Sequence, residues 1–170
     1  MRADCDTLLR MMDYLAQPTA VCVVRRDDDI FVCERADADS GLVFYRPLGG
    51  SLAPGERGHD AVARAIREEV NVEVSRLRYL GSIENISPAP DGAREVVLVY
   101  DGALNDPAIY AASSVEAYEN GSIAFKGVWK PLADFAGGHA LLRPDGLLDL
   151  LDRDDDDALP FFGVSSYSEL

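Results

Sequence analysis

One stretch of the sequence, residues 46–72 (RPLGGSLAPGERGHDAVARAIREEVNV), limits the possible folds more than any other. It opens with a run rich in proline and glycine, residue types that favour turns. It continues with small and apolar residues at spacings of three and four, as on one face of a helix. These are Ala61, Val62, Ala65, Ile66 and Val70. The stretch therefore predicts a turn followed by a helix over about residues 59–70.

Three glutamates lie in this helix or just before it. Glu56 precedes it, and Glu68 and Glu69 stand near its end. If the loop folds back, the three carboxylates can meet, and such oxygen ligands suit Mg²⁺ or Mn²⁺. The alternative is an ordinary solvated acidic helix, because Glu-Glu pairs and Arg-x-x-x-Glu spacings are common on helix surfaces.

The spacing of these residues favours the first interpretation, because it resembles the Nudix hydrolase signature. That signature runs glycine, five residues, glutamate, seven residues, Arg-Glu, an apolar residue, any residue, Glu-Glu, any residue, glycine and an apolar residue. The matching residues are Gly50, Glu56, Arg64, Ile66, Glu68, Glu69 and Val72. The resemblance extends through an RPLGG run, a Leu-Gly-x-x-Glu-Asn segment and a glutamate before the next apolar run.

Two positions depart from the signature. Asn71 replaces a glycine, a mild change because both residues tolerate the left-handed conformation that ends helices. Ala65 replaces a glutamate one turn before Glu68 and Glu69, on the face that would hold the metal. The second departure is expected to weaken the chemistry.

The resemblance implies a fold of the α/β class, an α/β/α sandwich around a mixed β-sheet. We expect this Nudix domain over residues 18–151, where apolar runs indicate several strands. Residues 1–17 are expected to form an amphipathic helix that packs on the domain or pairs with a second copy in a homodimer. Residues 152–170 are expected to form an acidic C-terminal tail, in which the charge run 152–157 is a solvated, poorly ordered segment and residues 158–170 are a mixture of apolar and polar residues.

The resemblance also implies hydrolysis of a nucleoside diphosphate linked to another group, with Mg²⁺ or Mn²⁺ as cofactor. By the same resemblance, Glu56, Glu68 and Glu69 bind the metal and Arg64 orients the carboxylates. Gly50 would let the backbone approach the site closely.

In parts of the family that the chain resembles, the residue at position 65 contributes to metal binding or acts as general base, and other members draw the base from elsewhere. Glu116 and Glu119, in the loosely patterned segment 105–122, are the main candidates. Glu95, at the start of an apolar strand, is a further candidate and a possible substrate contact. Arg46, just before the glycines, is expected either to face a substrate phosphate or to pair with a surface acid.

Composition narrows the partners. The net charge of −14 argues against a general surface for nucleic acid or anionic membranes. The resemblance implies a small nucleoside-diphosphate-type molecule as the partner. Three cysteines without a paired framework, and no evident signal peptide, indicate a cytoplasmic protein.

Two functions stay open on the sequence. The first is a hydrolase slowed by Ala65, and the second is a degenerate Nudix domain that binds a nucleotide-type ligand in a regulatory role. An interaction scaffold that uses the acidic tail is a weaker third alternative. The sequence does not identify the substrate.

Overall fold

The structure is a computed structural model that describes residues 18–37, 40–86, 94–152 and 162–166. The helix expected over residues 1–17 lies outside this part of the chain. The elements in chain order are β1 (Thr19–Arg26), β2 (Asp29–Ala36), β3 (Val43–Arg46), β4 (Leu48–Ser51), α2 (Gly58–Val70), β5 (Val74–Ile86), β6 (Arg94–Leu104), α3 (Pro107–Ala111), β7 (Ser114–Glu119), β8 (Ser122–Pro131), α4 (Leu132–Ala136), α5 (Leu147–Leu151) and β9 (Phe162–Ser166).

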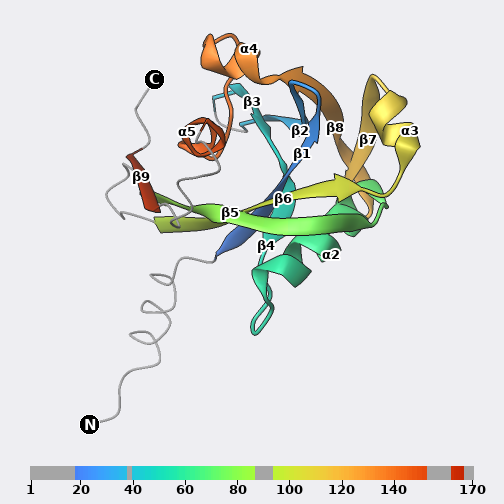
Figure 1. Cartoon of the computed structure of the whole chain (residues 1–170), viewed down its shortest axis with the longest axis horizontal. Coiled ribbons are helices and arrows are strands. Elements are labelled where there is room, and N and C mark those ends of the chain that lie inside the picture. Colours follow the sequence, from blue (N-terminus) through green and yellow to red (C-terminus); the bar gives the residue numbers. More distant parts are fainter. Residues whose placement is uncertain (1–17, 38–39, 87–93, 153–161, 167–170) are drawn as a thin grey trace.

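The described strands form one mixed sheet of nine. Its main path runs β7-β8-β2-β1-β6-β5-β9, with β3 paired to β2 and β4 paired to β1. The β1–β6 and β5–β9 pairs are parallel, whereas the other strand pairs are antiparallel. Helix α2 covers one face, and α4 and α5 lie on the other (Figure 1). The predicted α/β/α sandwich with a mixed sheet is confirmed.

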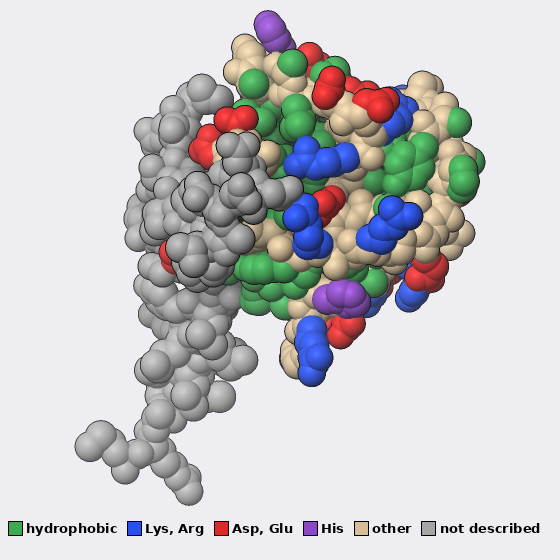
Figure 2. Space-filling view, in the orientation of Figure 1, with side chains coloured by type: hydrophobic (Ala, Val, Ile, Leu, Met, Phe, Trp, Pro, Cys, Tyr) green, Lys and Arg blue, Asp and Glu red, His purple; other side chains and the backbone are tan. Residues whose placement is uncertain are grey.

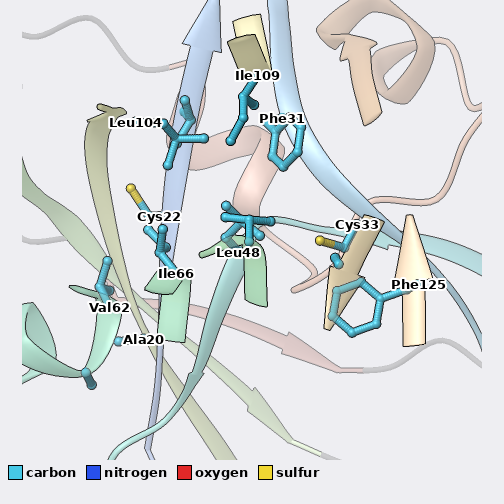
Figure 3. Packing of buried hydrophobic residues seen from close by; sticks show 14 residues of the cluster. Ala20, Cys22, Phe31, Cys33, Leu48, Val62, Ile66, Leu104, Ile109 and Phe125 are labelled. Carbon is cyan, nitrogen blue, oxygen red and sulfur yellow. The ribbon is translucent and has the colours of Figure 1, made fainter. Parts of the chain in front are cut away.

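Each face of the sheet carries its own apolar core, as expected for a sheet covered on both sides. On the α2 side, Val62 and Ile66 are fully buried beside Ala20 and Cys22 of β1 (Figure 3). On the other side, Ile83 packs with residues of the α5 region. The near-continuous apolar sequence of β1 follows from this arrangement, because its side chains are buried on both faces.

Helix α2 confirms the helix that was predicted, and it explains one departure from the signature. Its residues Ala61, Val62, Ala65 and Ile66 are buried, as the spacing indicated. Asn71 ends the helix in the left-handed conformation, with φ 55° and ψ 37°, and its amide donates to the carbonyl oxygen of Arg67. Asn71 therefore ends the helix in the conformation that the glycine of the signature would adopt.

Two local expectations were wrong. Leu48–Ser51, expected as part of a turn, is strand β4, paired antiparallel with β1. The segment expected as a loose loop over residues 105–122 contains helix α3 and strand β7. The C-terminal tail contains β9, which runs parallel to β5. Within the described residues, no helix is long and apolar enough to span a membrane.

Candidate functional site

The site is built where β4 passes the C-terminal half of α2. Gly49 pairs with Val21 of β1, and its φ of 150° is unfavourable for residues with a side chain. A Cβ at this position would collide with the carbonyl oxygen of Ala20. Only glycine lets the two strands approach in this way, and the approach exposes the Gly49 amide to α2.

The Glu69 carboxylate accepts a hydrogen bond from that amide. The Gly49 N–H donates to Glu69 Oε2 at 2.8 Å, and Glu69 is only 9% exposed. Burial raises the pKa of the Glu69 carboxyl to about 7, although the Gly49 hydrogen bond and the charges of Arg46 and Arg35 act in the opposite direction. The ionised Glu69 carboxylate is therefore poorly stabilised by its surroundings unless further positive charge is present.

Arg64 forms a second centre of the site. Its Nε and one terminal nitrogen donate to the two oxygens of Glu56, both at 2.8 Å, in a forked ion pair. The same guanidinium donates to the carbonyl oxygen of Ser51 at 3.0 Å and to Glu68 at 3.2 Å. These hydrogen bonds from Arg64 are the main reason that the pKa of Glu56 falls to about 2. Arg64 thus ties the loop before α2 to the helix and to β4.

Arg35 of β2 was not anticipated from the sequence. Its guanidinium lies 3.5 Å from Glu69 and 3.3 Å from Glu119, and it stacks 4.0 Å from the ring centroid of Phe125. It therefore joins α2 to the end of β7. A single arginine at the end of a strand carries no sequence signal, because its partners are 34 and 84 positions away.

These groups surround a hollow of about 330 Å³, which we call the Gly49 hollow. Three arginines and three glutamates line it together with the glycines of β4. The described lining residues are Thr19, Arg35, Arg46, Gly49, Gly50, Ser51, Arg64, Ala65, Glu68, Glu69, Tyr118, Glu119 and Asn120. Positive and negative side chains therefore face the same small space.

Most of the expected site residues meet in this hollow, but three do not line it. Arg46, Gly50, Arg64, Glu68, Glu69 and Glu119 do so. The Glu56 carboxylate is engaged by Arg64. Glu116 is exposed and lies opposite Lys126 in the β7–β8 pair. Glu95 lies in a neighbouring hollow, where it accepts a hydrogen bond from Thr19 Oγ1 at 3.3 Å.

A divalent cation in the Gly49 hollow would need oxygen ligands from the residues that line it. Among the residues that the structure describes, no group of three or more His, Cys, Asp or Glu side chains is placed to hold a metal ion. Mg²⁺, however, is commonly bound by only one or two carboxylates, with water and substrate phosphate as the other ligands. Glu68 and Glu69 face one hollow, and Glu69 is a poorly stabilised anion there. These two residues fit the cation, whereas Glu56 as a third ligand remains a prediction.

Ala65 lies on the wall of the Gly49 hollow and is 3% exposed. A Cβ at Gly50 would stand 3.5 Å from that of Ala65, an ordinary packing distance. The structure thus places position 65 on the side of α2 that faces the site, as the helix spacing indicated.

Comparison with known proteins agrees with this geometry. The NUDIX domain family matches residues 16–141. The chain belongs to the Nudix family. Among curated Nudix relatives, the NAD-capped RNA hydrolase NudC of Pseudomonas putida (strain W619) is 37% identical over 65 residues, and that of Pseudomonas fluorescens (strain Pf0-1) is 34% identical over the same length. These alignments cover 38% of this chain but only 23% of each relative.

Solved structures share the Nudix fold at low sequence identity. A MutT protein from Bacillus halodurans aligns with a TM-score of 0.62 and 14% identity, over 89% of this chain and 90% of its own. A NUDIX hydrolase from Nitrosomonas europaea aligns with a TM-score of 0.59 and 16% identity, over 86% of this chain and 97% of its own. At these identities the likeness establishes the fold and leaves the substrate open.

Proposed function

We propose that this Nudix protein hydrolyses the phosphoric anhydride bond of a small nucleoside-diphosphate-type substrate, with Mg²⁺ or Mn²⁺ as cofactor. The observation that carries the proposal is the composition of the Gly49 hollow, in which Arg35, Arg46 and Arg64 face the same space as three glutamates. Arginines suit phosphate oxygens, and carboxylates suit the cation that accompanies them. A lining that carries both arginines and glutamates suits a metal ion and a diphosphate bound together better than it suits either one alone.

The proposed metal ligands are Glu68 and Glu69. A divalent cation bound there would neutralise phosphate charge and lower the pKa of a bound water. The Gly49 amide fixes the Glu69 carboxylate by a hydrogen bond, and Arg64 contacts Glu68. Both carboxylates are therefore oriented by the protein before any ligand arrives, which reduces the cost of organising the site.

Arg46 is the proposed phosphate contact. Its guanidinium donates to the carbonyl oxygen of Gly49 at 3.2 Å, which holds the side chain at the edge of the hollow. Figure 2 shows one face of the molecule, on which basic and acidic side chains are mixed. Although the net charge is −14, Arg35, Arg46 and Arg64 all line the Gly49 hollow. Local positive charge of this kind lets an acidic protein attract a phosphorylated small molecule.

Glu119 is the proposed general base. It lines the Gly49 hollow and is held by Arg35, whereas Glu116 points away from the core beside buried Ala117. A carboxylate in this position can accept the proton of an attacking water. Removing a positioned base typically lowers a rate by about 10²- to 10⁴-fold.

The test is an assay of the purified full chain against a library of nucleoside diphosphates and their derivatives, with Mg²⁺ or Mn²⁺ and with chelator. We expect metal-dependent cleavage that Glu119→Gln lowers at least tenfold and the matched Glu116→Gln leaves nearly unchanged. Equal losses in the two variants would refute Glu119 as the base. No cleavage of any diphosphate would refute the hydrolase itself.

A second candidate, a regulatory domain that binds a nucleotide-type ligand without cleaving it, is favoured by one observation. Ala65 leaves the hollow without the carboxylate that the family signature has there, and Glu56 is held by Arg64. Thermal stabilisation by a nucleotide, in a protein inactive towards every substrate, would establish this function. The curated relatives are named for NAD-capped RNA, but the acidic charge of this chain favours a small molecule over the RNA itself.

A further inference from the structure

Arg35 of β2 contacts two carboxylates that come from different elements. One of its terminal nitrogens, Nη1, donates to Glu119 Oε1 at 3.3 Å, and the other, Nη2, lies 3.5 Å from Glu69 Oε1. Glu69 belongs to α2, and Glu119 is the last residue of β7. A guanidinium is planar and rigid, so its nitrogens keep fixed positions relative to one another. Arg35 therefore holds the two carboxylates beside each other.

The Arg35 side chain is itself held in place. Its Cζ lies 4.0 Å from the centroid of the Phe125 ring, and Phe125 belongs to the apolar core on the α2 side of the sheet. Only 21% of the Arg35 side chain is exposed. A guanidinium that is packed in this way has little freedom left to lose when it pairs with Glu69 and Glu119. It can therefore act as a fixed point for both carboxylates.

The Glu119 side chain, by contrast, needs a partner to fix its direction. It precedes the β7–β8 turn, in which Asn120 and Gly121 have φ values of 51° and 77°, as in a tight two-residue hairpin turn. This turn fixes the backbone, but the Glu119 side chain is 54% exposed. An exposed glutamate can adopt several rotamers in water. The ion pair with Arg35 is the interaction that directs Glu119 towards the Gly49 hollow.

We propose that Arg35 is a positioning residue, which keeps the Glu119 carboxylate next to that of Glu69 so that Glu119 can accept the proton of the attacking water. The inference rests on the proposed function, in which Glu69 binds the cation and Glu119 is the general base. A general base has to lie within about 2.6–3.2 Å of the atom that carries the proton. Ion pairs as exposed as this one add little to stability, so its contribution is the direction of the Glu119 side chain.

A direct contact with a substrate phosphate is the competing role for Arg35. Its Nε is buried and has no hydrogen-bond partner among the residues that the structure describes, and Arg35 lines the Gly49 hollow. The two roles differ in their kinetics. Losing a phosphate contact that is already made in the bound substrate raises KM, whereas losing the position of a base lowers kcat.

The test is steady-state hydrolysis by the purified full chain with Mn²⁺, using the diphosphate that wild type cleaves fastest in the library assay. Arg35→Met should lower kcat by roughly 10- to 100-fold and change KM by no more than about threefold. In the Glu119→Gln background the same substitution should lower kcat by no more than about twofold, because the base that it positions is already gone. Arg26→Met is the matched control, since Arg26 also packs on an aromatic ring, that of Trp129, and pairs with Asp29 outside the hollow. Its kcat should stay near that of wild type.

Two further variants keep the test valid if Arg35→Met folds poorly. Arg35→Lys keeps the charge but lacks the planar fork, so it should recover only part of the lost kcat. Phe125→Leu keeps an apolar side chain but removes the ring on which the guanidinium packs, and it should lower kcat with little change in KM. Wild-type kcat in both variants would overturn the proposal. A rise in KM of about tenfold or more in Arg35→Met, with a further loss of the same size in the Glu119→Gln background, would also overturn it.

The two proposals can fail separately, because the link between Arg35 and Glu119 also has a readout without catalysis. In thermal unfolding, the losses of Tm in Arg35→Met and Glu119→Gln should not add in the double variant, whereas those of Arg35→Met and Glu116→Gln should add. Non-additive losses without cleavage of any diphosphate would support the link and refute the hydrolase. Additive losses, or cleavage that Glu119→Gln slows and Arg35→Met does not, would overturn the link and leave the hydrolase standing.

Discussion

The clearest quantitative prediction concerns the stability of the Glu69→Gln variant without metal. The substitution keeps the shape of the side chain and an oxygen that can accept from the Gly49 amide, but it removes the buried charge. Because the folded-state pKa of Glu69 is raised from 4.5 to about 7, the folded protein holds this proton more tightly than the unfolded chain. The wild type therefore loses stability as pH rises from about 4.5 to 7, and the variant does not.

The size of the effect follows from the shift. The difference between 4.5 and about 7, at about 1.4 kcal/mol per pKa unit, gives an upper value of about 3 kcal/mol. For a domain of this size, that corresponds to a difference in Tm of roughly 6–12 °C at pH 8. At pH 4 the carboxyl is protonated in both states of the wild type, so the two proteins should be nearly equal.

The assay is urea denaturation of the two proteins in chelator from pH 4 to pH 8, with the difference in free energy of unfolding plotted against pH. Glu68→Gln is the matched control, because it removes a charge from the adjacent position, where the side chain is 63% exposed. Substitutions of such surface residues usually change stability by less than about 0.5 kcal/mol. The control should show no comparable dependence on pH.

A Glu69→Gln variant that is less stable than wild type at pH 8 would contradict this prediction. It would mean that Arg35 and the Gly49 amide stabilise the carboxylate more than burial disfavours it. Adding Mg²⁺ or Mn²⁺ at pH 8 gives a second readout. The cation should stabilise the wild type more than the variant, since only the wild type offers it a carboxylate at this position.

Two further predictions use the same denaturation assay, and a third uses thermal unfolding and hydrolysis. Gly49→Ala should lower the free energy of unfolding by at least about 2 kcal/mol, because the φ of Gly49 is 150° and a Cβ there meets a carbonyl oxygen of β1. Gly50→Ala should cost far less stability, and similar losses in the two variants would contradict this prediction. Arg64→Met should lower the free energy of unfolding at pH 7, and this loss should shrink as pH falls from 4.5 towards the lowered Glu56 pKa of about 2. A loss that stays constant with pH would argue against the ion pair between Arg64 and Glu56. Ala65→Glu should lower the Tm without metal, and adding Mn²⁺ should raise its Tm by more than it raises that of wild type, whereas Ala65→Gln should show no such gain. If the missing carboxylate limits the rate, Ala65→Glu should also raise hydrolysis at least tenfold.

The sequence was most informative where a local rule and the fold agree. The apolar run of residues 19–26 is typical of a strand, and it forms β1, which is buried on both faces. The spacing of Val62 and Ile66 predicted the buried face of α2, and Asn71 is a local helix ending. In each case the deciding interactions are with near neighbours, or with a core that accepts any apolar residue of suitable size.

The sequence failed where a residue is defined by a distant partner. A glycine-rich segment favours a turn by local preference, yet Gly49 and Gly50 form β4 because β1 pairs with them. Arg35 has no distinguishing neighbours, and its role depends on side chains from α2 and β7. Contacts between segments far apart in the sequence decided both cases.

Under the proposed function, the charges around the Gly49 hollow offer a way for the site to act without a glutamate at position 65. Arg35, Arg46 and Arg64 face Glu68, Glu69 and Glu119, so the positive and negative side chains of the lining are equal in number. A cation alone would meet three arginines, and a diphosphate alone would meet three carboxylates; each would therefore be partly repelled. Bound together, each supplies the charge that the other requires. Metal and substrate should thus bind with positive coupling, and by linkage each raises the affinity of the other by the same factor. A fourth carboxylate would favour the free metal and reduce this mutual dependence.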